Sequence, residues 1–422
     1  MGCTERKMTI GGLGVPRRVV IVMFILLAPF ASRSGKLAAY ARLTSTVPEL
    51  AVRRVPLALS PSALVVDEQT ARVFVTTSVN VSMLDAHTGM TLRVLVAPSA
   101  KRRPGFAPAM ALDPQRGHVF VGRGNTLSVL DAASGRTLRT VALAQAADRL
   151  VIDVPRDRVL VFDCGAIGRV AVVDATSGAV LDTKPGTTGG CRSRPMLNAA
   201  SGRVFISTAT GLSVFDVVTG RLQGSIPLSV PSDMIVAARQ SRVFVLSGVG
   251  SYNPTVAMLD ARSLRVLRRI SYGPFQNVVS LGGFLGGDEM RNHVFLYLLS
   301  PLGLQVLDAA SGKVLPTTAE PDLGATAGAI DPDTGYLYVS CIYDIDQFAG
   351  PRFDNGRVDV LDIRNGTTLA TAVIGYFPTT ITVSRRLRRV YVLVANPASG
   401  LGRIDIRHSE IDILNMLPAQ RQ

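Results

Sequence analysis

The sequence has little of the chemistry that most catalytic sites use. Its 422 residues contain no tryptophan, four histidines and four cysteines. No two histidines stand at the spacing of a metal site, and the sequence lacks a Gly-x-Ser-x-Gly elbow, a phosphate-binding loop and a paired His-Glu motif. A site assembled from distant segments would leave no motif, so an enzyme is disfavoured but not excluded. No catalytic residue is predicted.

Charged residues are also scarce, at 18% against 47% hydrophobic residues. This composition excludes a disordered chain and allows a large buried core. The charges are unbalanced, with 45 Lys and Arg against 31 Asp and Glu, which gives a formal net charge of +14. Such an excess favours an anionic partner, although charge on solvated loops also keeps a basic protein soluble.

The N-terminal segment differs from the rest of the chain. A positive stretch ending at Arg18 precedes an apolar run, 19–28, that is too short to span a bilayer comfortably. This pattern is typical of a signal peptide, but the cleavage patterns after it are poor, so an uncleaved anchor is the alternative. We expect 1–41 to be a signal peptide or an N-terminal membrane anchor, 42–422 to be one domain, and the protein to be extracytoplasmic (secreted, periplasmic or membrane-anchored).

One unit recurs about every 40 to 50 residues, which is the period of propeller blades. It consists of an apolar strand, a turn, a strand of the form Arg-Val-Phe-Val, a loop, a strand ending in Leu-Asp, a turn with glycine, and a closing strand. The β-branched and aromatic residues of these strands suit positions that neighbouring blades cover on both faces. The eight second strands begin at Arg72, His118, Arg158, Arg203, Arg242, His293, Tyr336 and Arg389.

Seven third strands end in an aspartate. The carboxylate can accept hydrogen bonds from the N–H groups of the turn, and the glycine four residues on supplies a positive φ. Because every blade needs this turn, we interpret these residues as turn caps rather than catalytic or metal-binding groups. They are Asp85, Asp131, Asp174, Asp216, Asp260, Asp308 and Asp362.

The eighth unit lacks that turn, and its last strand lies within 402–414 near the C-terminus. The segment 49–57, before the first unit, has the pattern of an orphan closing strand. The two segments can form one blade, which would clasp the ring shut and remove its open edges. We therefore predict an all-β chain, a β-propeller of four-stranded antiparallel blades. Eight blades are expected, with seven as the alternative if the last unit overlaps the first.

Two segments carry a family resemblance. Asp331-Pro-Asp-Thr-Gly-Tyr-Leu-Tyr-Val339 and Arg389-Val-Tyr-Val-Leu-Val-Ala-Asn396 resemble the YVTN-type (YncE-like) repeat of bacterial and archaeal surface and periplasmic propellers. The resemblance covers roughly residues 49 to 414 and implies the propeller fold. It implies no single function, because adhesion, surface-layer, nucleic-acid-binding and lactonase-like proteins share that repeat. The absence of tryptophan removes the WD signature.

The loops from strand two to strand three, and from strand four to the next blade, should emerge on one face. Irregular loops on a rigid scaffold often carry function, so we predict a binding scaffold that uses this face around the central channel. Its ligand would be a protein, a polysaccharide or a nucleic acid, and the net positive charge would suit a polyanion. The chain is expected to be a monomer. The candidate ligand-binding residues are Lys101, Arg102, Arg103, Arg123, Arg192, Arg194, Tyr343 and Arg352.

The loop 341–356 of the seventh unit departs most from the repeat. It contains four hard oxygen ligands that could gather around calcium, although their spacing matches no EF-hand. A solvated acidic loop, or an ion pair with Arg352, is the alternative. A bound metal would favour a lactonase-like hydrolase at the channel mouth as the alternative function; otherwise no cofactor is expected. The four ligands are Asp344, Asp346, Asp354 and Asn355.

Two cysteines fall in loops on the predicted binding face. Cys164 and Cys191 belong to the same unit, so a disulfide could join them in an oxidising compartment. Cys341 occupies a similar place in its own unit. We interpret Cys341 as a small buried hydrophobic residue.

Overall fold

The computed structural model divides the chain into two units, 1–47 and 48–422, of which only the second is described. The described ranges are 48–57, 61–77, 79–96, 108–165, 167–188, 190–249, 253–273, 283–298, 303–316, 325–342, 356–375, 377–395 and 409–418. Within these ranges, no helix is both long and apolar enough to cross a membrane.

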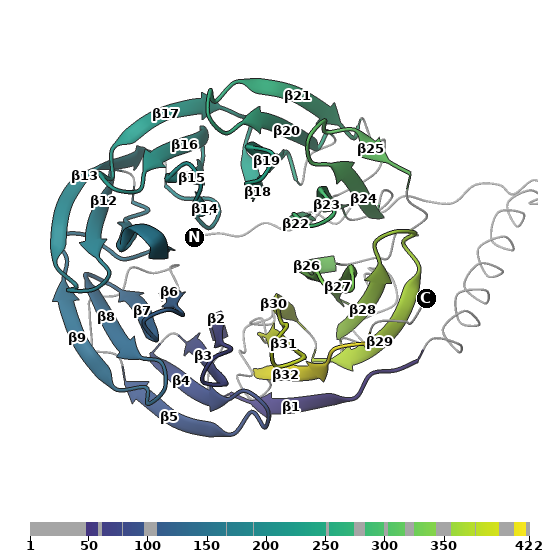
Figure 1. Cartoon of the computed structure of the whole chain (residues 1–422), viewed down its shortest axis with the longest axis horizontal. Helices are drawn as coiled ribbons and strands as arrows, with labels where there is room; N and C mark the ends of the chain where they lie inside the picture. Colours follow the sequence, from purple (N-terminus) through teal and green to yellow (C-terminus); the bar gives the residue numbers. More distant parts are fainter. Residues whose placement is uncertain are drawn as a thin grey trace, which may run out of the picture. The chain divides into compact units, whose positions relative to one another are not determined.

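The described strands form eight four-stranded antiparallel sheets, the blades of a ring (Figure 1). Blade 1 contains β2 (Pro61–Asp67), β3 (Arg72–Thr77), β4 (Asn80–Asp85) and β5 (Thr91–Val96), and blade 2 contains β6 (Ala109–Asp113), β7 (His118–Arg123), β8 (Thr126–Asp131) and β9 (Thr137–Ala142). Blade 3 contains β10 (Arg149–Asp153), the 3₁₀ turn η1 (Val154–Arg156), β11 (Arg158–Phe162), β12 (Ile167–Asp174) and β13 (Val180–Thr188), and blade 4 contains β14 (Met196–Asn198), β15 (Arg203–Thr208), β16 (Gly211–Asp216) and β17 (Leu222–Pro227). Blade 5 contains β18 (Pro231–Ala237), β19 (Arg242–Ser247), β20 (Thr255–Asp260) and β21 (Val266–Ser271), and blade 6 contains β22 (Gly283–Asp288), β23 (His293–Leu298), β24 (Gly303–Asp308) and β25 (Val314–Leu315). Blade 7 contains β26 (Ala325–Asp331), β27 (Tyr336–Ile342), β28 (Gly356–Asp362) and β29 (Thr368–Ile374), and blade 8 contains β30 (Pro378–Ser384), β31 (Arg389–Val394), β32 (Glu410–Asn415) and β1 (Val52–Pro56).

Blade 8 closes the ring with strands from both ends of the described chain. Its order is β1-β32-β31-β30, and β1 pairs antiparallel with β32 from Val52↔Leu414 to Pro56↔Glu410. The predicted clasp is confirmed, and the count is eight blades rather than seven. The first strand of each blade lies nearest the ring's axis and the fourth lies outermost (Figure 1).

The second strands are buried because alternate side chains pack against different neighbouring blades. In β3, Phe74 joins a cluster with Val119 of blade 2, whereas Val73 and Val75 join a cluster with Tyr391 of blade 8. All five side chains that follow Arg72 in β3 are buried. The Arg-Val-Phe-Val pattern therefore indicates a strand that is packed on both faces, as expected for strands between blades.

The aspartates at the ends of the third strands cap turns. Asp131 Oδ1 accepts hydrogen bonds from the backbone N–H of Ser134 at 2.7 Å and from its hydroxyl at 2.6 Å, and Gly135 has a φ of 68°. These bonds to Ser134 lower the pKa of Asp131, and similar bonds to turn residues lower the pKa of Asp85 and Asp174. The turn-cap interpretation is confirmed.

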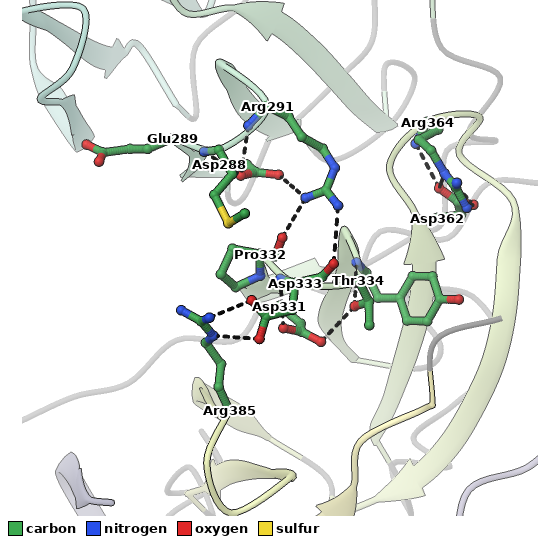
Figure 2. A network of polar contacts seen from close by, with 12 residues as sticks. Asp288, Glu289, Arg291, Asp331, Pro332, Asp333, Thr334, Asp362, Arg364 and Arg385 are labelled. Carbon is green, nitrogen blue, oxygen red and sulfur yellow. Dashed lines mark hydrogen bonds and ion pairs between the residues drawn. The ribbon is translucent and has the colours of Figure 1, made fainter. Parts of the chain in front are cut away.

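The turns between first and second strands link neighbouring blades (Figure 2). Arg291 donates to Asp288 Oδ2 of its own turn at 2.8 Å and to the carbonyl oxygen of Pro332 in blade 7 at 2.7 Å. Arg385 of blade 8 then donates from Nε to Asp333 Oδ2 at 2.9 Å. Arg156 of blade 3 repeats this arrangement with a bond to Ala199 O of blade 4 at 2.7 Å.

Candidate functional site

The two faces of the ring differ in regularity. In a four-stranded antiparallel meander, the first-to-second and third-to-fourth turns lie at one end, and we call this end the turn face. The second-to-third loops and the connections between blades lie at the other end, which we call the long-loop face. Every first-to-second turn has four residues, whereas the second-to-third loops range from two residues between β7 and β8 to 13 between β27 and β28 and 15 between β31 and β32. The units therefore keep one length on the turn face and differ in length on the long-loop face, where function is expected.

Most of the predicted site residues lie outside the described residues. This holds for all four predicted metal ligands and for five of the eight predicted ligand-binding residues, so their roles stay predictions. They are Lys101, Arg102, Arg103, Tyr343, Arg352, Asp344, Asp346, Asp354 and Asn355. Among the residues that the structure describes, no group of three or more His, Cys, Asp or Glu side chains could hold a metal ion.

A disulfide joins Cys164, just after β11, to Cys191, just after β13, with their Cα atoms 5.0 Å apart. The joined loops are fixed further by two backbone donors. Cys164 N–H donates to Asp148 Oδ2 at 2.9 Å, and Arg192 N–H donates to Ser207 O of blade 4 at 2.8 Å. The segment 190–195, which we call the pinned loop, is therefore anchored to both blade 3 and blade 4.

The pinned loop carries Arg192 and Arg194, both with exposed side chains. Arg194 Nη2 donates to Thr380 Oγ1 at 3.5 Å. Thr380 lies in β30, the innermost strand of blade 8, whereas the pinned loop leads into β14 of blade 4. Because blades 4 and 8 stand opposite each other in the ring (Figure 1), Arg194 reaches across the axis at the long-loop face.

Arg149, which the sequence reasoning missed, stands beside Arg194. It is the first residue of β10, and its guanidinium donates to Asp148 O at 2.9 Å. Burial and then the positive charge of Arg194 lower the pKa of Arg149, while Asp148 opposes the shift. The signal was available: first strands otherwise begin with proline or small and apolar residues, such as Ala109 in β6.

Arg123 does not belong to this cluster. Its Nη1 donates to Val79 O at 2.8 Å, which ties the second-to-third turn of blade 2 to the equivalent turn of blade 1. The structure therefore gives Arg123 a contact between blades on the same face. The predicted residues that it brings together are Arg192, Arg194 and the two cysteines.

A buried ionic group lies between blades 6 and 7. Asp359, in the middle of β28, forms a bidentate ion pair with Arg357, at 2.7 Å from Nε and 2.8 Å from Nη2. Cys341 Sγ lies 3.9 Å from Asp359 Oδ2, and both side chains are buried. Burial raises the pKa of Asp359 to about 6, although Arg357 opposes the shift, and burial also raises the pKa of the Cys341 thiol. Such a thiol is a poor nucleophile at neutral pH, in agreement with its interpretation as a core residue.

Asp412 occupies the equivalent position in blade 8. Its Oδ2 accepts a hydrogen bond from the N–H of Gly375 in blade 7 at 2.8 Å, and its side chain is fully buried. Burial raises its pKa to about 7, the backbone bond to Gly375 opposes the rise, and the nearby Glu410 adds to it. Six other blades have neutral side chains at this position: Ser82, Ser128, Ala171, Ser213, Ala257 and Gln305.

Comparison with solved structures supports the fold. The chain is similar to the crystal structure of BamB from Moraxella catarrhalis, with 16% identity, a TM-score of 0.55, and coverage of 88% of this chain and 100% of that chain. It is also similar to the WD40 repeats of RRP9 (14% identity, TM-score 0.52, 88% and 99% coverage) and to U3-55K (14% identity, TM-score 0.52, 87% and 100% coverage). No protein-family model and no curated protein sequence matches. By fold, the chain is an eight-bladed β-propeller; membership of the YVTN-repeat family stays a prediction.

Proposed function

We propose that this propeller is an extracytoplasmic scaffold that binds an acidic segment of a partner protein on its long-loop face. The observation that carries the proposal is the pinned loop, which presents the exposed Arg192 and Arg194 and holds Arg194 beside Arg149 at the ring's axis. The turn face uses its repeated carboxylates in local caps and links. The pinned loop instead places exposed cations on a fixed platform, which suits recognition of carboxylates.

The arrangement of these arginines favours a protein over a nucleic acid. Binding to a nucleic acid gains most of its affinity from a row of contacts to successive phosphates. Arg194 instead reaches from blade 4 to Thr380 of blade 8, so it spans the axis rather than following a groove. A short acidic segment that enters at the axis matches this geometry better.

The disulfide supports the extracytoplasmic location. Disulfides persist in oxidising compartments and are rare in the reducing cytosol. The apolar run 19–28, preceded by positive residues, supports the same location through a signal peptide or a membrane tether.

The test compares the two faces with matched charge reversals in the full-length chain. Polyglutamate serves as the acidic probe, and its affinity is measured across a salt series. We expect the double variant Arg192→Glu, Arg194→Glu to weaken binding about tenfold or more, because two charge-assisted contacts are lost. The control is Arg136→Glu, Arg221→Glu, which reverses two exposed arginines on the turn face. Equal losses in both variants would contradict the proposal.

A second arm of the experiment measures the affinity for a single-stranded oligonucleotide whose charge matches that of the polyglutamate. Tighter binding of the oligonucleotide that depends on Arg192 and Arg194 would overturn the protein partner in favour of a nucleic acid. Polyglutamate binding that requires these arginines and exceeds oligonucleotide binding supports the proposal.

A further inference from the structure

We propose that the outer edge of blade 5 is a docking surface for an anionic phospholipid membrane. The surface, which we call the basic rim, consists of five exposed side chains: Arg262, Arg265, Leu267, Arg268 and Arg269. They lie in the turn before β21 and in β21 itself, the outermost strand of the blade (Figure 1). The inference goes beyond the proposed binding of an acidic partner, because it concerns a different surface and a different class of partner.

Blade 5 carries more positive charge on this edge than its turn requires. In the turn, Asp260 Oδ1 accepts from the N–H of Ser263 at 2.7 Å, and Asp260 N–H donates to Arg265 O at 2.9 Å. The equivalent backbone bond of blade 3 ends on Ala179 O, so the turn needs only the backbone at this position. The turn therefore does not account for the side chain of Arg265.

The arginines of the basic rim are not neutralised by the rest of the described chain. Among the residues that the structure describes, none of the four forms an ion pair, and Arg268 donates only to Ser311 O of blade 6 at 3.3 Å. The carboxylate of the turn, Asp260, is instead paired with Arg242 at 2.8 Å. The rim therefore presents a surplus of positive charge, which an anionic surface would offset.

The neighbouring blades extend the rim on both sides. Leu264 Cδ1 lies 3.1 Å from where a Cβ of Gly224 would stand, so the turn of blade 5 packs against β17 of blade 4. In β17, Leu222 is exposed. On the other side, Arg268 lies against the equivalent turn of blade 6, where Lys313 is exposed. Cationic and apolar side chains therefore lie together along the outer edge of three blades.

An exposed leucine within the rim favours a lipid surface over a nucleic acid. Leu267 is 47% exposed and precedes Arg268 in β21. Proteins that lie on membranes combine basic side chains with apolar ones that enter the boundary between headgroups and acyl chains. Affinity for a nucleic acid comes mainly from phosphate contacts, which need no apolar side chain. β21 also lies on the outer circumference of the ring (Figure 1), where a broad surface can reach it.

The experiment measures co-sedimentation of the full-length chain with two kinds of vesicle in a salt series. One kind contains equal parts of phosphatidylglycerol and phosphatidylcholine, and the other contains phosphatidylcholine alone. We expect Arg265→Glu with Arg269→Glu to lower the affinity for the anionic vesicles about tenfold or more, because cations near an anionic surface contribute to binding. The control, Arg192→Glu with Arg194→Glu, makes the same change in net charge on the long-loop face and should leave that affinity nearly unchanged.

A second comparison tests the apolar side chain. Leu181 occupies the place of Leu267 in blade 3 and is 50% exposed, but Asp182 follows it where Arg268 follows Leu267. Leu267→Ser should lower the affinity for the anionic vesicles about fivefold, since less apolar surface leaves water on docking, whereas Leu181→Ser should not. Hydrogen–deuterium exchange on the same vesicles should slow at 262–271 and stay unchanged at 176–184.

Three outcomes would overturn the inference. Equal affinities of the wild-type protein for the two kinds of vesicle would show that anionic lipid is not recognised. Equal losses in the two charge variants would show only diffuse attraction. Tighter binding of a single-stranded oligonucleotide through Arg265 and Arg269, with no effect of Leu267→Ser, would assign the rim to a nucleic acid. Each of these results leaves the polyglutamate test unaffected, because that test depends on Arg192 and Arg194.

Discussion

The turn face and the long-loop face are built from the same eight units, yet different interactions hold them. On the turn face, charges are used locally and repeatedly: Asp131 caps its own turn, and Arg291 joins its own turn to the next blade. On the long-loop face, the described part of the chain holds one disulfide, and Arg194 there contacts the far side of the ring. The difference shows that the repeat stabilises the ring, while departures from the repeat mark candidate binding groups.

The same contrast exists within single third strands. Asp362 at the end of β28 is held by Arg364, whose hydrogen bond lowers the pKa of Asp362. Asp359, three residues earlier, is buried, and its pKa is raised to about 6. The ionised form of the strand-end aspartate is therefore stabilised by its partners, whereas burial disfavours the ionised form of the mid-strand aspartate.

The largest expected effect comes from replacing Asp412 with asparagine. Since the pKa of Asp412 is raised from 3.8 to about 7 in the folded chain, its contribution to stability is present below about pH 4 and is lost as the pH rises through 7. The shift corresponds to about 4 kcal/mol at most. We expect Asp412→Asn to gain stability relative to the wild type between pH 4 and pH 8, as measured by urea unfolding. A constant difference between the two proteins across this range would contradict the assignment.

The disulfide has the next largest effect, and it acts on the long-loop face. The double variant Cys164→Ser, Cys191→Ser opens a loop with a sequence separation of 27, which should cost about 3 kcal/mol. Chemical denaturation at pH 7 measures this cost. Polyglutamate binding should weaken in the same variant, because Arg194 is no longer held at the axis. Unchanged binding after loss of the disulfide would show that the pinned loop is not the binding element.

Removal of a cap on the turn face should lower stability without weakening the binding of polyglutamate. Asp131→Ala removes the acceptor of two hydrogen bonds from Ser134, so we expect a loss of about 1 to 2 kcal/mol of stability. Polyglutamate affinity of the folded protein should stay within about twofold of the wild type, because the cap lies on the face away from Arg194. Ser134→Ala is the control and should cost less, since its backbone N–H keeps the carboxylate as partner.

The smallest effect tests an exception within the repeat. In blade 5, Leu264 occupies the place of the turn glycine with a φ of 61°, and its Cδ1 lies 3.1 Å from where a Cβ of Gly224 in blade 4 would stand. In blade 1, the residue equivalent to Gly224 is Arg93, and its Cδ lies 3.4 Å from where a Cβ of the turn glycine Gly135 in blade 2 would stand. We expect Gly224→Ala to destabilise the wild-type protein but to leave the stability of the Leu264→Gly variant unchanged. The double-mutant cycle should therefore give a coupling energy of about 1 kcal/mol between the two positions. Additive effects would disprove this compensation.

The sequence predicted the fold well because each unit carries its own local signals. The second strands begin at the predicted residues, such as Arg72 and Tyr336, since two packed faces require a continuous apolar run. The closing pair β1 and β32 was also predictable, because the eighth unit lacked a closing strand and the segment 49–57 lacked a blade of its own. Repetition supplies eight observations of one pattern, which makes the local signals strong.

The site was predictable only in part, because its contacts are not local. The sequence placed Cys164 and Cys191 on one face but could not show that Arg194 meets Thr380, which is 186 residues away. An arginine at the start of β10 distinguishes this first strand from the others, but the sequence could not show that Arg149 stands beside Arg194. Asp412 was missed because its burial depends on how blade 7 packs against blade 8.

Hydrogen–deuterium exchange of the full-length chain, with and without polyglutamate, tests the central claim most directly. The account predicts slower exchange in the pinned loop and at 144–149, with no change in the capped turns at 131–136 and 174–179. Protection of those turns, with an unchanged pinned loop, would contradict the claim that the long-loop face binds the partner.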